Sequence, residues 1–147
     1  TLDKLSLEEG SKLAVIARPF FNKGDQDAET AALAVSCAND QDKGKEMRAL
    51  LFSQAKGQAV ATADVEADAG QLGLDSADFS TCLTNPEKLE KIEKLNAEAA
   101  GYEVLGAPTM FVGSEMVVGA RPYDDYTDSN GDHIEGLKSL VSRKLGK

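Results

Sequence analysis

The most informative part of the sequence is the stretch Gly106-Ala107-Pro108-Thr109-Met110-Phe111-Val112. Its last four residues and Glu115-Met116-Val117-Val118 favour two strands, and Gly113-Ser114 between them is a two-residue hairpin loop with glycine first. A proline that opens a strand lacks the N–H that a sheet ladder needs. A cis Ala107–Pro108 bond would solve this by turning the chain so that its backbone edges face outward, although only about 5–6% of X–Pro bonds are cis.

A second strand is expected near the start of the chain. Leu13-Ala14-Val15-Ile16-Ala17 is a continuous apolar run, which is the pattern of a strand covered on both faces. Pro19 ends this strand and Asn22-Lys23-Gly24-Asp25 forms a turn. Before the strand, residues 1–9 have a helical pattern that stops at Gly10.

Helices fill the sequence between the two strand regions. Asp27 is placed to cap the first helix and Asp75 or Ser76 to cap the fourth, while Lys56-Gly57-Gln58 breaks the second and Thr62 opens the third. The apolar stripes that define these helices lie in residues 31–38, 47–52, 63–72, 75–83 and 86–100. After the hairpin, a polar loop over residues 123–132 leads to a last helix that uses Ile134 to Leu145.

Length and charge limit the function classes. The chain has 147 residues, the length of one domain or of one domain with an insertion. Asp and Glu number 25 against 16 Lys and Arg, for a net charge of −9, and acids are in excess on both sides of Gly70. Nucleic-acid binding needs clustered Lys and Arg, so this charge argues against a nucleic-acid partner. No apolar run approaches the roughly 20 residues of a transmembrane helix.

Four segments with distinctive motifs follow one another along the chain. They are an Ala-rich helix that ends in Cys-Ala-x-x-Gln (31–41), Leu-Leu-Phe (50–52), Leu-Gly-Leu-Asp with a following Phe and Cys-Leu (72–83), and the Gly-Ala-Pro-Thr hairpin with its later Gly-Ala (106–120). Together they resemble the DsbA-like branch of the thioredoxin-fold thiol–disulfide oxidoreductases. The resemblance implies an α/β fold, a thioredoxin-like sheet formed by residues 1–24 and 101–147, with residues 25–100 as an inserted α-helical domain.

The resemblance also implies a function. Members of this family exchange disulfides with exported proteins, so we expect thiol- or disulfide-containing protein partners and a periplasmic or other extracytoplasmic location. The family pattern also implies that the Ala107–Pro108 bond is cis, and we predict this. Pro108 would pack against the active-site sulfurs, and Ala107 and Thr109 beside it would hold the substrate chain by strand addition. We expect no cofactor and no metal.

One departure from the family pattern concerns the catalytic cysteines. The family's nucleophile is a Cys-x-x-Cys at a helix N-terminus, where the helix lowers the thiol pKa. This sequence has only Cys37 and Cys82 and no such motif. Residues 1–9 read as the tail of the active-site helix, so we expect the N-terminal strand and the motif to lie upstream of Thr1.

The two cysteines allow three interpretations. They are a redox pair, a structural disulfide of the inserted domain, or two buried thiols that act as small apolar residues. Some members of the family carry a disulfide of the second kind, and we adopt that prediction for Cys37 and Cys82. A disulfide fits an oxidising compartment.

Two other functions remain as alternatives. The hairpin, followed by Gly119 and Arg121, also resembles the glutathione-dependent isomerases and kappa-class transferases, which use the same scaffold. Alternatively, the chain is a non-catalytic binding module, in which case an exposed sheet edge at Val15 would favour a homodimer.

One loop has an alternating pattern of oxygen-bearing side chains. Asp128-Ser129-Asn130-Gly131-Asp132 is like the start of a calcium loop, but His133 and Ser139 stand where such a loop needs glycine and glutamate. We interpret it as a solvated loop. His133 is the only histidine, and no glycine-rich phosphate loop or Ser-His-Asp set is present.

Overall fold

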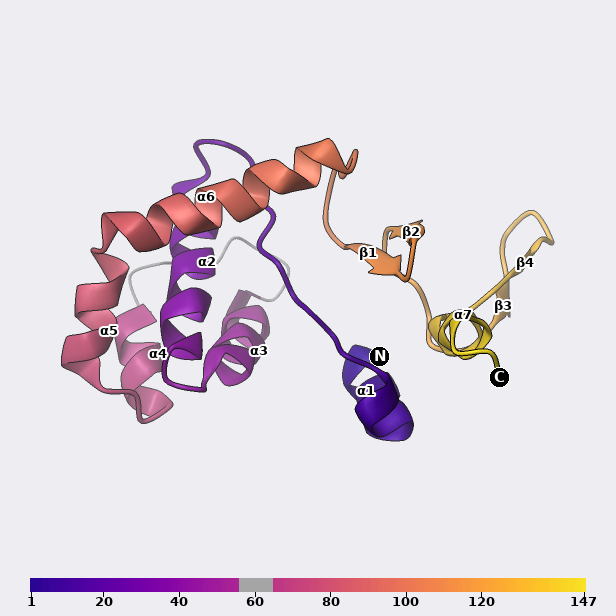
Figure 1. Cartoon of the computed structure of the whole chain (residues 1–147), viewed down its shortest axis with the longest axis horizontal. Coiled ribbons are helices and arrows are strands. Elements are labelled where there is room, and N and C mark those ends of the chain that lie inside the picture. Colours follow the sequence, from indigo (N-terminus) through magenta and orange to yellow (C-terminus); the bar gives the residue numbers. More distant parts are fainter. Residues whose placement is uncertain (56–64) are drawn as a thin grey trace. The chain divides into compact units, whose positions relative to one another are not determined.

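The computed structural model describes residues 1–55 and 65–147 (Figure 1). The chain forms two compact units, one of Thr1–Ala17 with Glu103–Lys147 and one of Arg18–Tyr102. We call the first the sheet unit and the second the helical unit. The predicted break at Lys56-Gly57-Gln58 and the predicted helix start at Thr62 lie outside the described residues.

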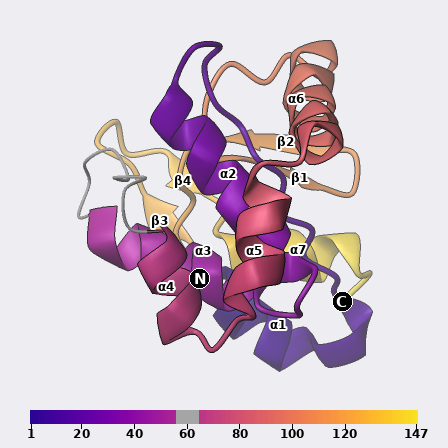
Figure 2. The same cartoon turned by 90° about the vertical axis from the view of Figure 1, so that its left-hand side faces the viewer.

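The helical unit is built around α2, which contacts each of the other helices that the structure describes in this unit (Figure 2). Its helices are α2 (Gln26–Asn39), α3 (Gly44–Ala55), α4 (Val65–Gln71), α5 (Ser76–Leu83) and α6 (Pro86–Gly101). One hydrophobic cluster fills the space between them, formed by Leu33, Ala34, Cys37, Ala38, Met47, Leu51, Val65, Ala69, Leu74, Phe79 and Ile92. The predicted apolar stripes supply these residues except Leu74, which lies in the predicted turn between α4 and α5.

Side-chain caps start three of these helices. Asp75 accepts a hydrogen bond from the backbone N–H of Asp78 and caps α5, as predicted, and Asn85 caps α6 just before Pro86. The predicted cap of α2 was wrong by two residues. Asp25, and not Asp27, accepts from the N–H of Ala28, because Asp27 already lies inside the first helical turn.

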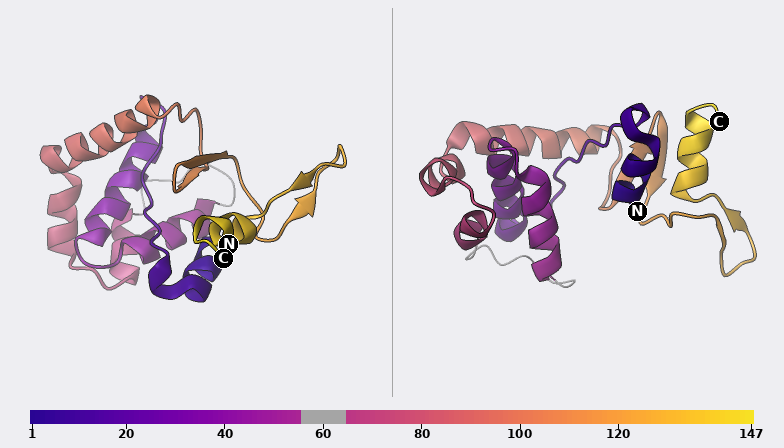
Figure 3. Two further views of the ribbon diagram at one scale, coloured as in Figure 1. Left: turned by 45° about the vertical axis from the view of Figure 1, so that its right-hand side comes forward. Right: turned by 90° about the horizontal axis from the view of Figure 1, so that it is seen from below.

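The sheet unit packs two helices against a hairpin (Figure 3). Its elements are α1 (Leu2–Glu9), the 3-10 helix η1 (Gly10–Lys12), β1 (Thr109–Val112), β2 (Glu115–Val118), β3 (Tyr126–Thr127), β4 (His133–Ile134) and α7 (Leu137–Lys144). Leu5 of α1, Val117 of β2 and three residues of α7 form its buried cluster. The predicted hairpin is confirmed: β1 pairs antiparallel with β2 from Thr109 opposite Val118 to Val112 opposite Glu115, and Gly113 has a φ of 63°.

Two sequence predictions about elements of the sheet unit were wrong. Residues 13–17 are not a strand, and Val15 and Ile16 are exposed. A strand needs a hydrogen-bonded neighbour, and the two sheets of the described chain pair only β1 with β2 and β3 with β4. Ile134 belongs to β4 and not to the last helix, because the predicted loop folds back at Asp128–Asp132 into a short second hairpin.

Candidate functional site

The candidate substrate-binding residues lie in the turn that leads into β1. The Ala107–Pro108 peptide bond is cis, the conformation expected from the sequence. Ala107 and Pro108 are exposed, and Thr109 is half-buried as the first residue of β1. The Thr109 hydroxyl donates to the backbone oxygen of Gly106 at 2.6 Å, which closes the turn from the inside.

The ladder determines which backbone groups this turn presents. Pro108 pairs with Gly119, whose N–H donates to the Pro108 oxygen at 2.9 Å. The backbone N–H and C=O groups of successive residues alternate between the two edges of a strand. Met110 therefore also forms its backbone hydrogen bonds with β2, whereas the N–H and C=O groups of Ala107 and Thr109 point to the opposite edge. Among the described residues, β1 has no second partner strand. We call this the open edge of β1.

The two faces of the hairpin differ in burial. Met110, Val112 and Val117 face α1 and α7 and take part in the buried cluster of the sheet unit. On the opposite face Met116 and Val118 are exposed, with 69% of Val118 accessible. The open edge of β1 therefore borders an apolar surface.

A cluster of charges holds the hairpin against α7. Arg143 of α7 pairs with Glu115 of β2 at 3.1 Å and with Glu135 at 2.7 Å, and Lys144 pairs with Glu115 at 3.0 Å. Hydrogen bonds from Lys144 and then Arg143 lower the pKa of Glu115, and the Arg143 guanidinium lowers the pKa of Glu135. These pairs join β2 and the segment before α7 to the last turn of α7.

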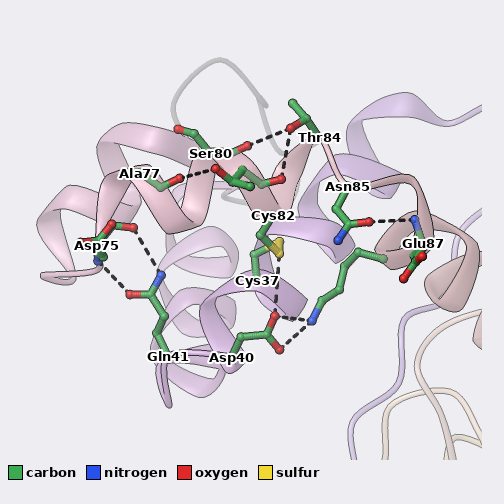
Figure 4. The surroundings of a disulfide bond; sticks show 12 residues. Cys37, Asp40, Gln41, Asp75, Ala77, Ser80, Cys82, Thr84, Asn85 and Glu87 are labelled. Carbon is green, nitrogen blue, oxygen red and sulfur yellow. Dashed lines mark hydrogen bonds and ion pairs between the residues drawn. A yellow bond between two sulfur atoms is a disulfide. The ribbon is translucent and has the colours of Figure 1, made fainter.

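The predicted Cys37–Cys82 disulfide is present and joins α2 to α5 with a Cα–Cα distance of 5.8 Å (Figure 4). Cys37 is only 1% exposed within the cluster of the helical unit, whereas Cys82 is half-buried at its rim. Asp40 at the end of α2 places its Oδ2 atom 3.8 Å from the Cys82 sulfur. Lys88 of α6 donates to Asp40 Oδ1 at 2.6 Å.

Neither the alternating acidic loop nor any other described cluster forms a metal site. Asp128 uses one carboxylate oxygen to accept from the N–H groups of Asn130 and Asp132, both at 2.9 Å. In the part of the chain that the structure describes, no group of three or more His, Cys, Asp or Glu residues is positioned to hold a metal ion. None of the described helices is long and apolar enough to cross a membrane.

Several contacts around these sites were not predicted from sequence. They are the Lys88–Asp40 pair, the Arg143–Glu115 pair, and Asn96, whose side chain bonds both the N–H and the C=O of Phe21 at 2.9 Å. Each joins residues far apart in the chain, and no local pattern of spacing signals such a pair. Gly136 was missed as well, although a β-carbon there would overlap the backbone of Asp124.

The two units together are those of an α/β thioredoxin-like fold with a helical insertion. A sequence profile of the DSBA-like thioredoxin domain matches residues 3–129. The chain therefore belongs to the DSBA-like thioredoxin domain family. Searches of curated proteins and of solved structures returned no match.

Proposed function

We propose that this chain is the substrate-binding scaffold of a thiol–disulfide oxidoreductase of DsbA type, which acts on exported proteins by disulfide exchange. The observation that carries the proposal is the open edge of β1 beside the exposed Ala107–Pro108 turn, in a chain of the DSBA-like family. Ala107, Pro108 and Thr109 bind the substrate, because an extended peptide gains main-chain hydrogen bonds by adding to such an edge.

The domain assignment supports this arrangement. We propose that residues 1–24 and 101–147 are the thioredoxin-like part and that residues 25–100 are the inserted helical domain. The two compact units, whose boundaries along the chain fall at Ala17–Arg18 and Tyr102–Glu103, support this division. The binding edge and the disulfide then belong to different domains.

The proposed exchange chemistry needs a reactive thiol, and these 147 residues hold no Cys-x-x-Cys. Their one cysteine pair is a disulfide with Cys37 buried. We therefore expect the chain as given to show no turnover in an insulin-reduction assay. Turnover that disappears in Cys82→Ser would contradict this and would make Cys37–Cys82 the redox centre.

Peptide binding tests the edge itself. A six-residue extended peptide with alternating apolar side chains and one blocked cysteine is titrated into the ¹⁵N-labelled chain. The amide signals of Ala107 and Thr109 should shift more than that of Met110, whose N–H is bonded to β2. The same peptide with alternate amides N-methylated cannot pair and should leave all three signals in place. Shifts confined to the helical unit would refute binding at this edge.

The compartment and the partners follow from the same proposal. An extracytoplasmic, periplasmic location is favoured by the Cys37–Cys82 disulfide, since such bonds persist in oxidising compartments. The partners are proteins with thiols or disulfides.

A homodimer would use the open edge of β1, since Val15 is not in a strand. Sedimentation velocity measures whether the chain forms such a dimer.

A further inference from the structure

The two sulfurs of the Cys37–Cys82 disulfide differ in access. Cys37 lies in the buried stripe of α2 between Ala34 and Ala38 and is 1% exposed. Cys82 lies near the end of α5 and is half-buried. Thiol–disulfide exchange requires a thiolate to reach one sulfur while the other departs. Cys82 is therefore more accessible to an external thiolate than Cys37 in the folded chain.

The charges beside Cys82 affect how readily a thiolate approaches its sulfur. The Asp40 carboxylate, 3.8 Å from the Cys82 sulfur, repels an approaching thiolate (Figure 4). Lys88 donates to both oxygens of the same carboxylate, and its side chain is only 18% exposed. Its ammonium offsets the negative charge next to the sulfur, because opposite charges at this distance compensate one another in the field that the thiolate meets.

We propose that Cys82 is the site through which this disulfide exchanges with small thiols such as glutathione, with Lys88 as the residue that offsets the charge of Asp40 next to the sulfur. The thiolate attacks the Cys82 sulfur, the Cys37–Cys82 bond breaks, and Cys37 leaves as a thiolate that takes a proton from water. A second thiolate attacks the external sulfur and releases Cys82. Two external thiolates are thereby oxidised to one disulfide, and the protein disulfide is reduced to two thiols.

The same steps run backward when the bond forms. In the reduced chain, the Cys82 thiolate attacks a small disulfide such as glutathione disulfide and carries the mixed disulfide. The Cys37 thiolate then attacks Cys82 and expels the second external thiolate. Cys82 is accordingly the modified residue in both directions, and this site is separate from the proposed substrate edge in the sheet unit.

Mapping of the mixed disulfide in the unaltered chain is the first test. The folded, oxidised chain is incubated with reduced glutathione, quenched with acid at intervals, unfolded, treated with a maleimide and digested. Mass spectrometry should find glutathione on Cys82 at least roughly tenfold more often than on Cys37. Equal labelling, labelling mainly on Cys37, or no adduct on Cys82 during reduction would overturn the proposal.

Charge variants test the role of Lys88 and Asp40. The rate of reduction by glutathione should rise about threefold in Asp40→Asn and fall about threefold in Lys88→Gln, and both changes should shrink at high salt. Glu90→Gln and Lys94→Gln are matched controls, since they alter an exposed ion pair on the same helix as Lys88, and they should leave the rate unchanged. If Asp40→Asn and Lys88→Gln change the rate in the same direction, a loosened helix contact and not the local charge controls access, and the assignment to Lys88 fails.

Discussion

At the scale of the residue, the stability of the helical unit depends strongly on the buried side chain of Phe79. It is the largest fully buried side chain in the described chain and lies 1% exposed among α2, α4 and α5. Phe79→Ala should destabilise the unit by about 3–5 kcal/mol, through lost burial and the cavity that remains. Phe52→Ala is the matched control, since Phe52 is 74% exposed and its truncation should change stability by no more than about 0.5 kcal/mol. Urea unfolding followed by circular dichroism measures both, and equal costs would contradict the assigned core.

Arg143 makes the stability of the sheet unit depend on pH. The pKa values of Glu115 and Glu135 are lowered by their basic partners, Lys144 and Arg143 for Glu115 and Arg143 for Glu135. A carboxyl whose folded pKa is lowered stabilises the fold above its ordinary pKa of 4.5, and that stability is lost as the pH falls through the folded value.

We therefore expect the urea midpoint to fall between about pH 5 and pH 3, with a smaller fall in Arg143→Met. Tyrosine fluorescence reports the transition, and Lys12→Met is the control for a general change in charge. An unchanged pH profile in Arg143→Met would show that these carboxyls do not depend on Arg143.

At the scale of the element, Gly136 holds the start of α7 against the preceding loop. Its N–H donates to Asp125 at 2.8 Å, and a β-carbon there would overlap the backbone of Asp124. Gly136→Ala should destabilise the sheet unit by about 1–3 kcal/mol, because the overlap is with backbone that has little room to move. Gly70→Ala is the matched control in α4, where a β-carbon meets nothing within 4 Å. If both variants unfold at the same denaturant concentration, the close approach at Gly136 is not rigid.

The disulfide between α2 and α5 is the other element-scale feature. Its cysteines are 45 residues apart, and a loop of this length gives about 4 kcal/mol in the chain-entropy description. The double variant Cys37→Ala/Cys82→Ala should lose roughly this amount in urea unfolding, and a reducing agent should destabilise the parent chain but not the variant. A variant as stable as the parent would show that the helices pack equally well without the bond.

At the scale of the whole molecule, the helical unit should fold by itself. Its cluster and its disulfide both lie within residues 18–102, and the segment is continuous. The isolated fragment should unfold cooperatively and keep its helical circular dichroism. The sheet unit draws on two separate segments, so a fragment of residues 103–147 lacks Leu5 and should not form the buried cluster around Val117. A non-cooperative transition in fragment 18–102 would mean that its stability depends on the sheet unit.

Local patterns in the sequence determined much of this protein. The hairpin around Gly113-Ser114, the caps at Asp75 and Asn85 and the apolar stripes of the helices all follow from rules that act within a few residues, and the structure contains them. The Cys37–Cys82 bond was predicted through family resemblance and not through spacing. The family profile over residues 3–129 agrees with that resemblance.

Strand pairing, contacts between distant charges and the exposed surfaces were decided by the tertiary structure alone. The apolar run at residues 13–17 has strand composition but remains unpaired among the described residues, because a strand depends on a neighbour that its own sequence does not specify. The contacts of Asp40 with Cys82 and of Arg143 with Glu115 join segments that are distant in the chain, so only packing brings those charges together. The exposed side of Cys82 and the open edge of β1 are likewise surfaces, and a surface is defined only after the core has formed.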